Sequence, residues 1–181
     1  MVWELKKLGD VCEIINGNTP LKSNKSFWEN GTINWFSIDD FREQGKYIEV
    51  TAKKVTTHAK VRVLPKNTVL LCCTASIGEV AIASSPMATN QQFNGLLIKN
   101  KEELNYEYLY YFCLTLKKQL LQLSSTTTIS FLSTTKLKKL ELFLPPLPEQ
   151  KSIVAKLDKA FAEIDKCMEF TKKEKIMVDE L

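Results

Sequence analysis

Residues 144–158 set the organisation of this chain: Leu144-Pro145-Pro146-Leu147-Pro148-Glu149-Gln150-Lys151-Ser152-Ile153-Val154-Ala155-Lys156-Leu157-Asp158. Proline has a fixed φ and no amide hydrogen, so three prolines cannot continue a sheet ladder, yet proline suits the first turn of a helix. Glu149 follows at the point where the positive end of a helix dipole stabilises a carboxylate. The stretch therefore predicts the end of a globular body and the start of a helix.

An apolar repeat continues from this junction toward the C-terminus. Its main positions step alternately by three and four residues: Val154, Leu157, Phe161, Ile164 and Met168. Such spacing forms the a/d seam through which one helix packs against another. A helix over 148–181 would be about 50 Å long, which is too long to bury its stripe on a small domain. We expect part of the seam to meet a second helix; the alternative is docking on its own domain only.

Charge is divided unequally at this boundary. Residues 1–145 hold 18 Lys and Arg against 13 Asp and Glu, a net charge of +5, whereas residues 146–181 hold 7 against 8, a net charge of −1. A positive globular part suits a polyanionic partner, although many proteins without one have a similar balance. We expect a globular domain over 1–145 and a helix over 146–181.

Short apolar segments separated by turn residues dominate the globular part. Strands are expected over 61–64, 68–73, 79–83, 95–98 and 140–144. Helical spacing predicts an amphipathic helix over 104–122, and residues 5–15 read as a short helix or turn that packs Leu5, Leu8, Val11 and Ile15 inward. The fold class is α+β: a mixed domain of short strands followed by a long C-terminal coiled-coil helix.

Several classes of protein are disfavoured. The five cysteines contain no Cys-x-x-Cys pair and there is one histidine, so we expect no metal site and reduced, buried thiols. Apolar runs are far shorter than the roughly 20 residues that cross a membrane. Phosphate-binding and nucleophile-elbow motifs are missing from the sequence. We expect a cytoplasmic, non-catalytic chain that binds no cofactor.

Four loops carry side chains suited to DNA, in which cations bind phosphates while amides and hydroxyls read base edges. The candidates are Lys22, Ser23, Asn24 and Lys25; Thr74, Ser76 and Gly78; Asn90, Gln91 and Gln92; and Ser125, Thr126, Thr127 and Thr128. Each loop alone could equally be a solvated turn, because turns favour the same residues. Trp28, Trp35 and Phe36 are interpreted as core aromatics rather than base-stacking platforms.

Motifs along nearly the whole chain follow an order and spacing typical of one family. They are Trp3-x-x-x-x-Leu8-x-Asp10-Val11, Gly17-x-Thr19-Pro20, Trp28-x-x-Gly31-x-Ile33-x-Trp35, Leu64-Pro65-x-x-Thr68, Ala75-Ser76-Ile77-Gly78, Asn90-Gln91-Gln92 and the Pro-Pro-Leu-Pro-Glu-Gln junction at 145–150. The chain resembles Type I restriction-modification specificity subunits, in which this junction joins a DNA target-recognition domain to a spacer helix. Members normally carry two of each, so this chain resembles a half-subunit or a fragment.

The resemblance implies a non-catalytic subunit that reads one half of a bipartite double-stranded DNA site. It implies methyltransferase subunits, which use S-adenosylmethionine, and an ATP-driven motor-nuclease subunit as partners. It also implies a second spacer helix, which we expect from another copy in a homodimer with antiparallel helices. The alternative is a coiled-coil adaptor that binds protein only, and a filter-binding assay with duplex DNA discriminates the two.

Overall fold

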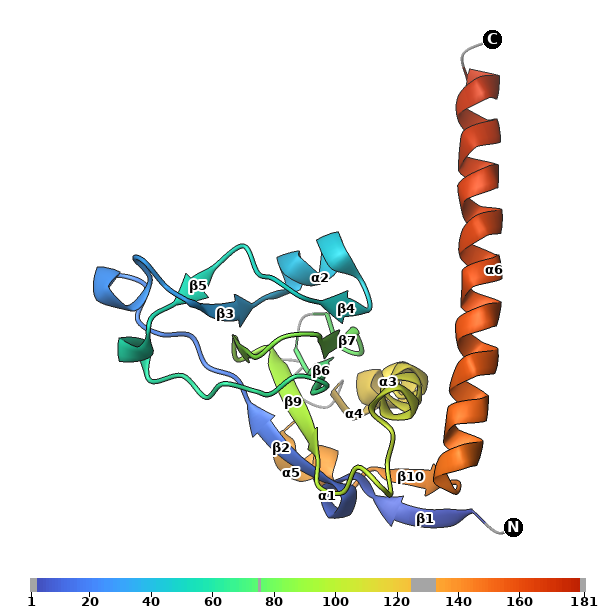
Figure 1. Ribbon diagram of the computed structural model, residues 1–181, viewed down its shortest axis with the longest axis horizontal. Helices are drawn as coiled ribbons and strands as arrows, with labels where there is room; N and C mark the ends of the chain where they lie inside the picture. Colours follow the sequence, from blue (N-terminus) through green and yellow to red (C-terminus); the bar gives the residue numbers. More distant parts are fainter. Residues whose placement is uncertain (1–2, 75, 125–132, 180–181) are drawn as a thin grey trace.

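The computed structural model describes the backbone of residues 3–74, 76–124 and 133–179, with side chains at all of these except 123, 124 and 172–179. A body of short strands lies to one side, and the long helix α6 (Leu147–Asp179) stands beside it and extends past it (Figure 1). The predicted α+β class with a long C-terminal helix is confirmed.

A five-stranded sheet forms the centre of the body. Its strands lie in the order β2 (Cys12–Asn16), β9 (Phe93–Ile98), β6 (Val69–Cys72), β7 (Val80–Ala83) and β4 (Tyr47–Ile48). Neighbours pair antiparallel, except that β4 runs parallel to β7. Every residue of β6 and β7 is buried, which explains why these segments are continuous apolar runs. The strands predicted over 68–73, 79–83 and 95–98 are confirmed.

Two smaller sheets flank the central one. The three-stranded sheet lies on the side away from α6 and consists of β5 (Lys54–Val55), β3 (Ile33–Phe36) and β8 (Met87–Thr89) (Figure 1). At the N-terminal end of α6, which we call its foot, β1 (Glu4–Lys7) pairs with β10 (Glu141–Leu144). The short helices are α1 (Leu8–Val11), η1 (Lys25–Phe27), α2 (Ile38–Gln44), η2 (Thr57–Ala59) and α5 (Thr134–Lys138).

Two predicted segments are wrong in part. Residues 5–15 belong to β1, the single turn α1 and β2, and Leu5 is 53% exposed rather than packed inward. Both strands pair with partners far along the chain, and such pairing outweighs a local helical spacing. Within 61–64, Leu64 alone pairs, through an isolated bridge to Met87.

The helix predicted over 104–122 is divided into α3 (Tyr106–Thr115) and α4 (Lys117–Ser124). At the break, the amide of Leu116 donates to the carbonyl of Cys113 over 3.1 Å, which is the tighter spacing of a 3-10 turn. Leu109 and Leu120 are fully buried, so both helices keep an apolar face on the core. The predicted period was therefore right, and a turn interrupts it.

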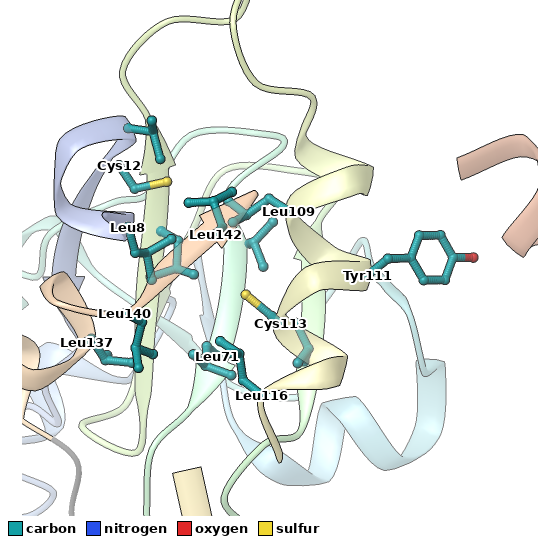
Figure 2. Close-up of a cluster of buried hydrophobic side chains, with 14 of the residues drawn as sticks. Leu8, Cys12, Leu71, Leu109, Tyr111, Cys113, Leu116, Leu137, Leu140 and Leu142 are labelled. Atoms are coloured by element: carbon teal, nitrogen blue, oxygen red, sulfur yellow. The ribbon is translucent and has the colours of Figure 1, made fainter. Parts of the chain in front are cut away.

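The main core lies between the central sheet, α3 and α5. Figure 2 shows side chains from strands and helices that meet there, among them Leu8, Cys12, Leu71, Leu109, Cys113, Leu137 and Leu142. Each fully buried leucine contributes about 1.5–3 kcal/mol, so this cluster holds α3 against the sheet. Tyr111 lies on the outer side of α3 and extends toward α6.

The foot of α6 is fixed by one buried amide. Gln150 is 0% exposed, and its Nε2 donates to the carbonyls of Glu103 and Pro145 over 2.8 Å each. Its Oε1 accepts from the amide of Asn105 over 2.9 Å, just before α3 begins. Val154, one turn further on, is 5% exposed and joins the main core. The first turns of α6 therefore belong to the domain.

The cysteines are free thiols, of which Cys12, Cys72, Cys73 and Cys113 are buried and Cys167 is exposed on α6. Burial raises the pKa of both Cys12 and Cys73 to about 12. Among the residues with a described placement, no His, Cys, Asp or Glu are grouped as metal ligands. The described helices include none with the length and apolar character needed to cross a bilayer.

We expect one thiol, that of Cys167, to react with Ellman's reagent in the native protein, and all five to react in guanidinium. The thiolate is the reactive species, and burial both excludes the reagent and raises the thiol pKa. Absorbance of the released thionitrobenzoate counts the thiols. Cys167→Ser should abolish the native reaction; a rapid reaction that persists in this variant would contradict the burial of the other four.

Candidate nucleic-acid interface

Three polar segments meet at one end of the central sheet. Residues 16–19 end β2 and continue beyond it, residues 74–78 connect β6 to β7, and residues 90–92 precede β9. The strand register brings them together, because Asn16 pairs with Asn94 and Cys72 pairs with Phe93 at the same end of β9. We call these three segments the rim; Ala75 within it lies outside the described residues.

Two backbone hydrogen bonds hold the rim segments beside one another, and each joins a rim residue to a residue directly next to another rim segment. The amide of Gly17 donates to the carbonyl of Phe93 over 3.0 Å, and the amide of Cys73 donates to the carbonyl of Gln92 over 2.9 Å. A Cβ atom at position 17 would lie 2.1 Å from the carbonyl oxygen of Asn90. Only glycine permits this approach, so Gly17 keeps the first segment on the third.

The rim carries no charged residue. Its residues are Asn16-Gly17-Asn18-Thr19, Thr74-Ala75-Ser76-Ile77-Gly78 and Asn90-Gln91-Gln92. Neutral amides and hydroxyls both donate and accept hydrogen bonds, which is the property needed to discriminate base edges. The composition of the rim therefore suits base recognition better than phosphate binding.

The three amides at 90–92 are not equivalent. Asn90 is 8% exposed, and its Nδ2 donates to Oε1 of Gln92 over 3.0 Å while its Oδ1 accepts from the Gln92 amide over 2.9 Å. These bonds close the turn and use both polar atoms of the Asn90 side chain and Oε1 of Gln92. Gln91 is exposed, and its Oε1 accepts from the hydroxyl of Thr19. The structure thus gives Asn90 and Gln92 a role within the turn and leaves Gln91 the most exposed of the three side chains.

In the 74–78 segment, Gly78 faces the protein rather than an open surface. Its φ is +84°, and a Cβ atom there would lie 2.7 Å from Cγ of Lys117 at the start of α4. The close approach predicted for Gly78 is therefore made by α4. Oγ1 of Thr74 is buried with no hydrogen-bond partner among the described residues, and Ser76 is half-buried. Ser76 is thus the more accessible hydroxyl of the two.

The loop of residues 22–25 lies apart from the rim, on the three-stranded sheet. Lys22, Ser23 and Lys25 are exposed, and the Lys25 ammonium lies 3.9 Å from the Glu29 carboxylate. Such an exposed pair contributes little and leaves the cation available. Oδ1 of Asn24 accepts from the Ser26 amide over 3.1 Å and caps η1, so Asn24 has a local role.

Two tryptophans connect this loop to the rim. The Trp28 and Trp35 rings meet edge to face with centroids 5.1 Å apart. Trp35 donates from Nε1 to the carbonyl of Asn18 in the rim over 3.1 Å, and Trp28 donates to the carbonyl of Leu21 over 3.2 Å. Trp35 is 4% exposed. The interpretation of these residues as packing aromatics fits their positions.

The remaining candidates divide between two places. Ser125, Thr126, Thr127 and Thr128 lie outside the described residues, so their contribution stays a prediction. On α6, Val154 is buried in its own domain and Leu157 packs partly against the same core. Phe161, Ile164 and Met168 are 43%, 51% and 65% exposed. The apolar seam therefore packs on its own domain at Val154 and Leu157, and it is largely exposed to solvent from Phe161 to Met168.

Sequence reasoning missed a buried asparagine beneath the rim. Asn94 is 0% exposed, and its Oδ1 accepts from Nδ2 of Asn16 over 3.2 Å, while the same Nδ2 lies 3.4 Å from the carbonyl of Gln91. Nδ2 of Asn94 has no hydrogen-bond partner among the described residues. One signal was available, because Asn94 is a polar residue inside an otherwise apolar strand.

Comparison with known sequences gives one family. The model described as the Type I restriction modification DNA specificity domain matches residues 2–178. The chain is 32% identical over 145 residues to the Type I restriction enzyme EcoprrI specificity subunit of Escherichia coli, covering 78% of this chain and 35% of that protein. It is 32% identical over 161 residues to the MjaIX specificity subunit of Methanocaldococcus jannaschii, covering 86% and 37%. The chain thus spans about a third of these relatives.

Solved structures agree on the fold. The HsdS subunit from Thermoanaerobacter tengcongensis is similar with a TM-score of 0.72 at 23% identity, over 91% of this chain and 38% of that chain. A chain from a study of assembly and conformational transition in the type I R-M system is similar with a TM-score of 0.75 at 24% identity. This similarity covers 91% of the present chain and 39% of that chain. Since the family model runs through both the domain and the helix, the chain belongs to the Type I restriction-modification DNA specificity family.

Proposed function

We propose that the globular domain reads one half of a bipartite DNA sequence, as part of the specificity subunit of a Type I restriction-modification complex. The observation that carries this proposal is the family match over residues 2–178. The geometry supports it, because Trp28 and Trp35 connect an uncharged polar rim to a loop with two exposed lysines. Lysines that bind phosphates position a protein on the duplex, while neutral side chains read the bases.

Within the rim, Gln91 is the residue to which we assign base contact first. Its side chain is exposed, whereas Asn90 is buried and Gln92 is half-buried, and these two side chains bond to each other within the turn. The hydroxyl of Thr19 holds Oε1 of Gln91, so the amide is oriented before DNA arrives. Such pre-organisation lowers the entropy cost of binding. Ser76, Thr74 and Ser23 are secondary candidates, and Lys22 and Lys25 are assigned to phosphates.

The chemistry would belong to partner chains. In this proposal methyltransferase subunits, which use S-adenosylmethionine, and an ATP-driven motor-nuclease subunit assemble on the specificity subunit in the cytoplasm. This chain supplies recognition and a scaffold, and it carries no catalytic residues. The adaptor alternative is less favoured, because the family match includes the domain as well as the helix.

The outer part of α6 would pair with a second spacer helix. Phe161, Ile164 and Met168 form an exposed apolar stripe at heptad spacing, and stripes of this kind commonly mark interaction surfaces. We propose an antiparallel arrangement in a homodimer, which would place two recognition domains at opposite ends. Val154 is excluded from this contact because it already packs on its own domain.

Lys22→Ala combined with Lys25→Ala should weaken binding to every duplex sequence and reduce the salt slope by about 2, since each phosphate-bound lysine contributes about 1. Fluorescence anisotropy with labelled duplex across a range of salt concentrations gives the slope. Lys156→Ala combined with Lys159→Ala is the control, because it removes the same charge at the same spacing from α6. Equal slopes for the wild type and the loop variant would remove these lysines from the interface.

Gln91→Ala should cost about 1–3 kcal/mol against the cognate half-site and leave nonspecific binding unchanged, because one amide contact to a base is lost. Methylation sequencing of cells that express the complete system reports this as a lost or relaxed motif. The control is Asn90→Ala, which removes a buried hydrogen-bonded amide and should lower the thermal midpoint instead. An unchanged motif in Gln91→Ala would exclude the residue from base reading.

Ile164→Asp combined with Met168→Asp should convert a dimer to a monomer without unfolding the domain, because a charge would enter the apolar seam. Phe161 is left intact because it also contacts its own domain. Sedimentation velocity measures the mass, and Ala162→Asp with Lys166→Asp on the outer face of the helix is the control. A wild-type chain that sediments as a monomer would speak against self-pairing.

A further inference from the structure

Helix α6 contacts its own domain along one face from Gln150 to Phe161, with Leu157 packed partly against the core in between, and the two ends of this contact differ in kind. The first is the foot, where Gln150 and Val154 are buried. The second lies further along the helix, at Asp158 and Phe161, where α6 passes the outer side of α3. Two contacts along a rod determine its direction, whereas one contact leaves it free to pivot. The second contact therefore controls the angle at which α6 leaves the domain.

A lysine from outside α3 and α6 closes the second contact. The ammonium of Lys46 lies 2.7 Å from Oδ1 of Asp158. It also lies over the ring of Tyr111, 4.6 Å from the centroid, and 5.1 Å from the centroids of both Tyr47 and Tyr110. An ammonium among aromatic faces is stabilised by their quadrupoles, and more so where water is partly excluded. The Lys46 side chain is 21% exposed, so this position is largely shielded.

Tyr111 on α3 contacts both Asp158 and Phe161 of α6. Its hydroxyl donates to Oδ1 of Asp158, and its ring stacks on that of Phe161 with centroids 5.7 Å apart at 14°. Burial acts to raise the pKa of Asp158, but the hydrogen bonds from Lys46 and Tyr111 outweigh it and the pKa is lowered. Burial and the bond to Asp158 raise the pKa of Tyr111. Asp158 stays ionised and Tyr111 stays protonated at neutral pH, so the contact is maintained.

A small change of angle at this contact has a large effect at the far end of the helix. If α6 pivots on its foot at Val154, the helix extends about 38 Å from there to Asp179, so a tilt of about 10° moves its end by about 7 Å. Successive base pairs are about 3.4 Å apart along duplex DNA. Loss of the second contact would therefore vary the separation of two recognition domains by more than one base pair.

We propose that Lys46, Tyr111 and Asp158 are positioning residues that fix the direction of α6 and thereby the half-site separation that the assembled subunit accepts. This inference rests on the function proposed above for its second part, since a half-site separation exists only if two domains read DNA. Its first part, the fixed direction of α6, is a property of the chain alone. The two parts are tested separately.

The direction of α6 is measured by the distance between two spin labels. Cys167 is an exposed thiol on α6, and Val50→Cys adds an exposed thiol on the domain. Dilution of labelled chain with excess unlabelled chain leaves one labelled copy in any dimer. We expect one narrow distance distribution for this parent protein.

Asp158→Asn and Tyr111→Phe should each broaden the distribution by about 3 Å, because Cys167 lies about 20 Å along the helix from Val154 and a tilt of about 10° moves it by that distance. Lys46→Arg should keep it narrow, because a guanidinium also pairs with a carboxylate and stacks on aromatic rings. Glu163→Gln removes an exposed carboxylate elsewhere on α6 and is the matched control. Asp158→Asn and Tyr111→Phe are nearly isosteric with the native residues, so the domain should keep its thermal midpoint in these two variants. Narrow distance distributions in both Asp158→Asn and Tyr111→Phe would overturn the proposal.

The functional part is tested with the complete methyltransferase and a set of duplexes that differ in half-site separation by one base pair. The wild type should prefer one separation, and in Asp158→Asn this preference should fall about tenfold, which corresponds to about 1.4 kcal/mol. An unchanged preference would overturn the link to DNA spacing. If no duplex is methylated by the wild type, the proposed DNA-reading function fails, while the spin-label result still decides the role of the contact.

Discussion

The buried amide of Gln150 is the contact on which the two-part organisation of this chain depends. Its Oε1 accepts a hydrogen bond from the Asn105 amide, and its Nε2 donates to the carbonyls of Glu103 and Pro145. These three backbone groups would otherwise lie unpaired at the junction. A buried polar group without a partner costs about 1–3 kcal/mol, so one side chain prevents several such losses. The end of β10, the start of α3 and the first turn of α6 are thereby held as one unit.

The rim and the contact of α6 with α3 lie in separate parts of the fold. The rim lies at the N-terminal end of β9, next to Phe93, while α6 packs beyond α3 on another side of the domain (Figure 1). A change of side chain at Gln91 therefore need not disturb the foot of α6, and a change at Asp158 need not disturb the rim. In the function proposed above, this arrangement lets base preference vary while the helix geometry stays constant.

Much of the fold was predictable from local pattern. Buried strands such as β6 and β7 are continuous apolar runs, and the helical period over 104–122 and the apolar repeat after residue 147 correspond to real helices. Residues 5–15 were mispredicted because β1 and β2 take their conformation from β10 and β9, far along the chain. In the candidate site, Asn90, Gln91 and Gln92 look alike in sequence. Only the closed turn distinguishes the exposed amide of Gln91 from the other two.

The sequence by itself determined the class of fold, the start of α6 near residue 147 and the family, because turn chemistry, apolar period and motif spacing are local properties. The tertiary structure alone decided which residues cooperate. It showed that Val154 serves its own domain while Ile164 stays exposed. It also brought Lys46 to Asp158 across 112 positions of sequence. Periodicity describes which face of a helix is apolar, but the partner of that face depends on long-range packing that no local pattern encodes.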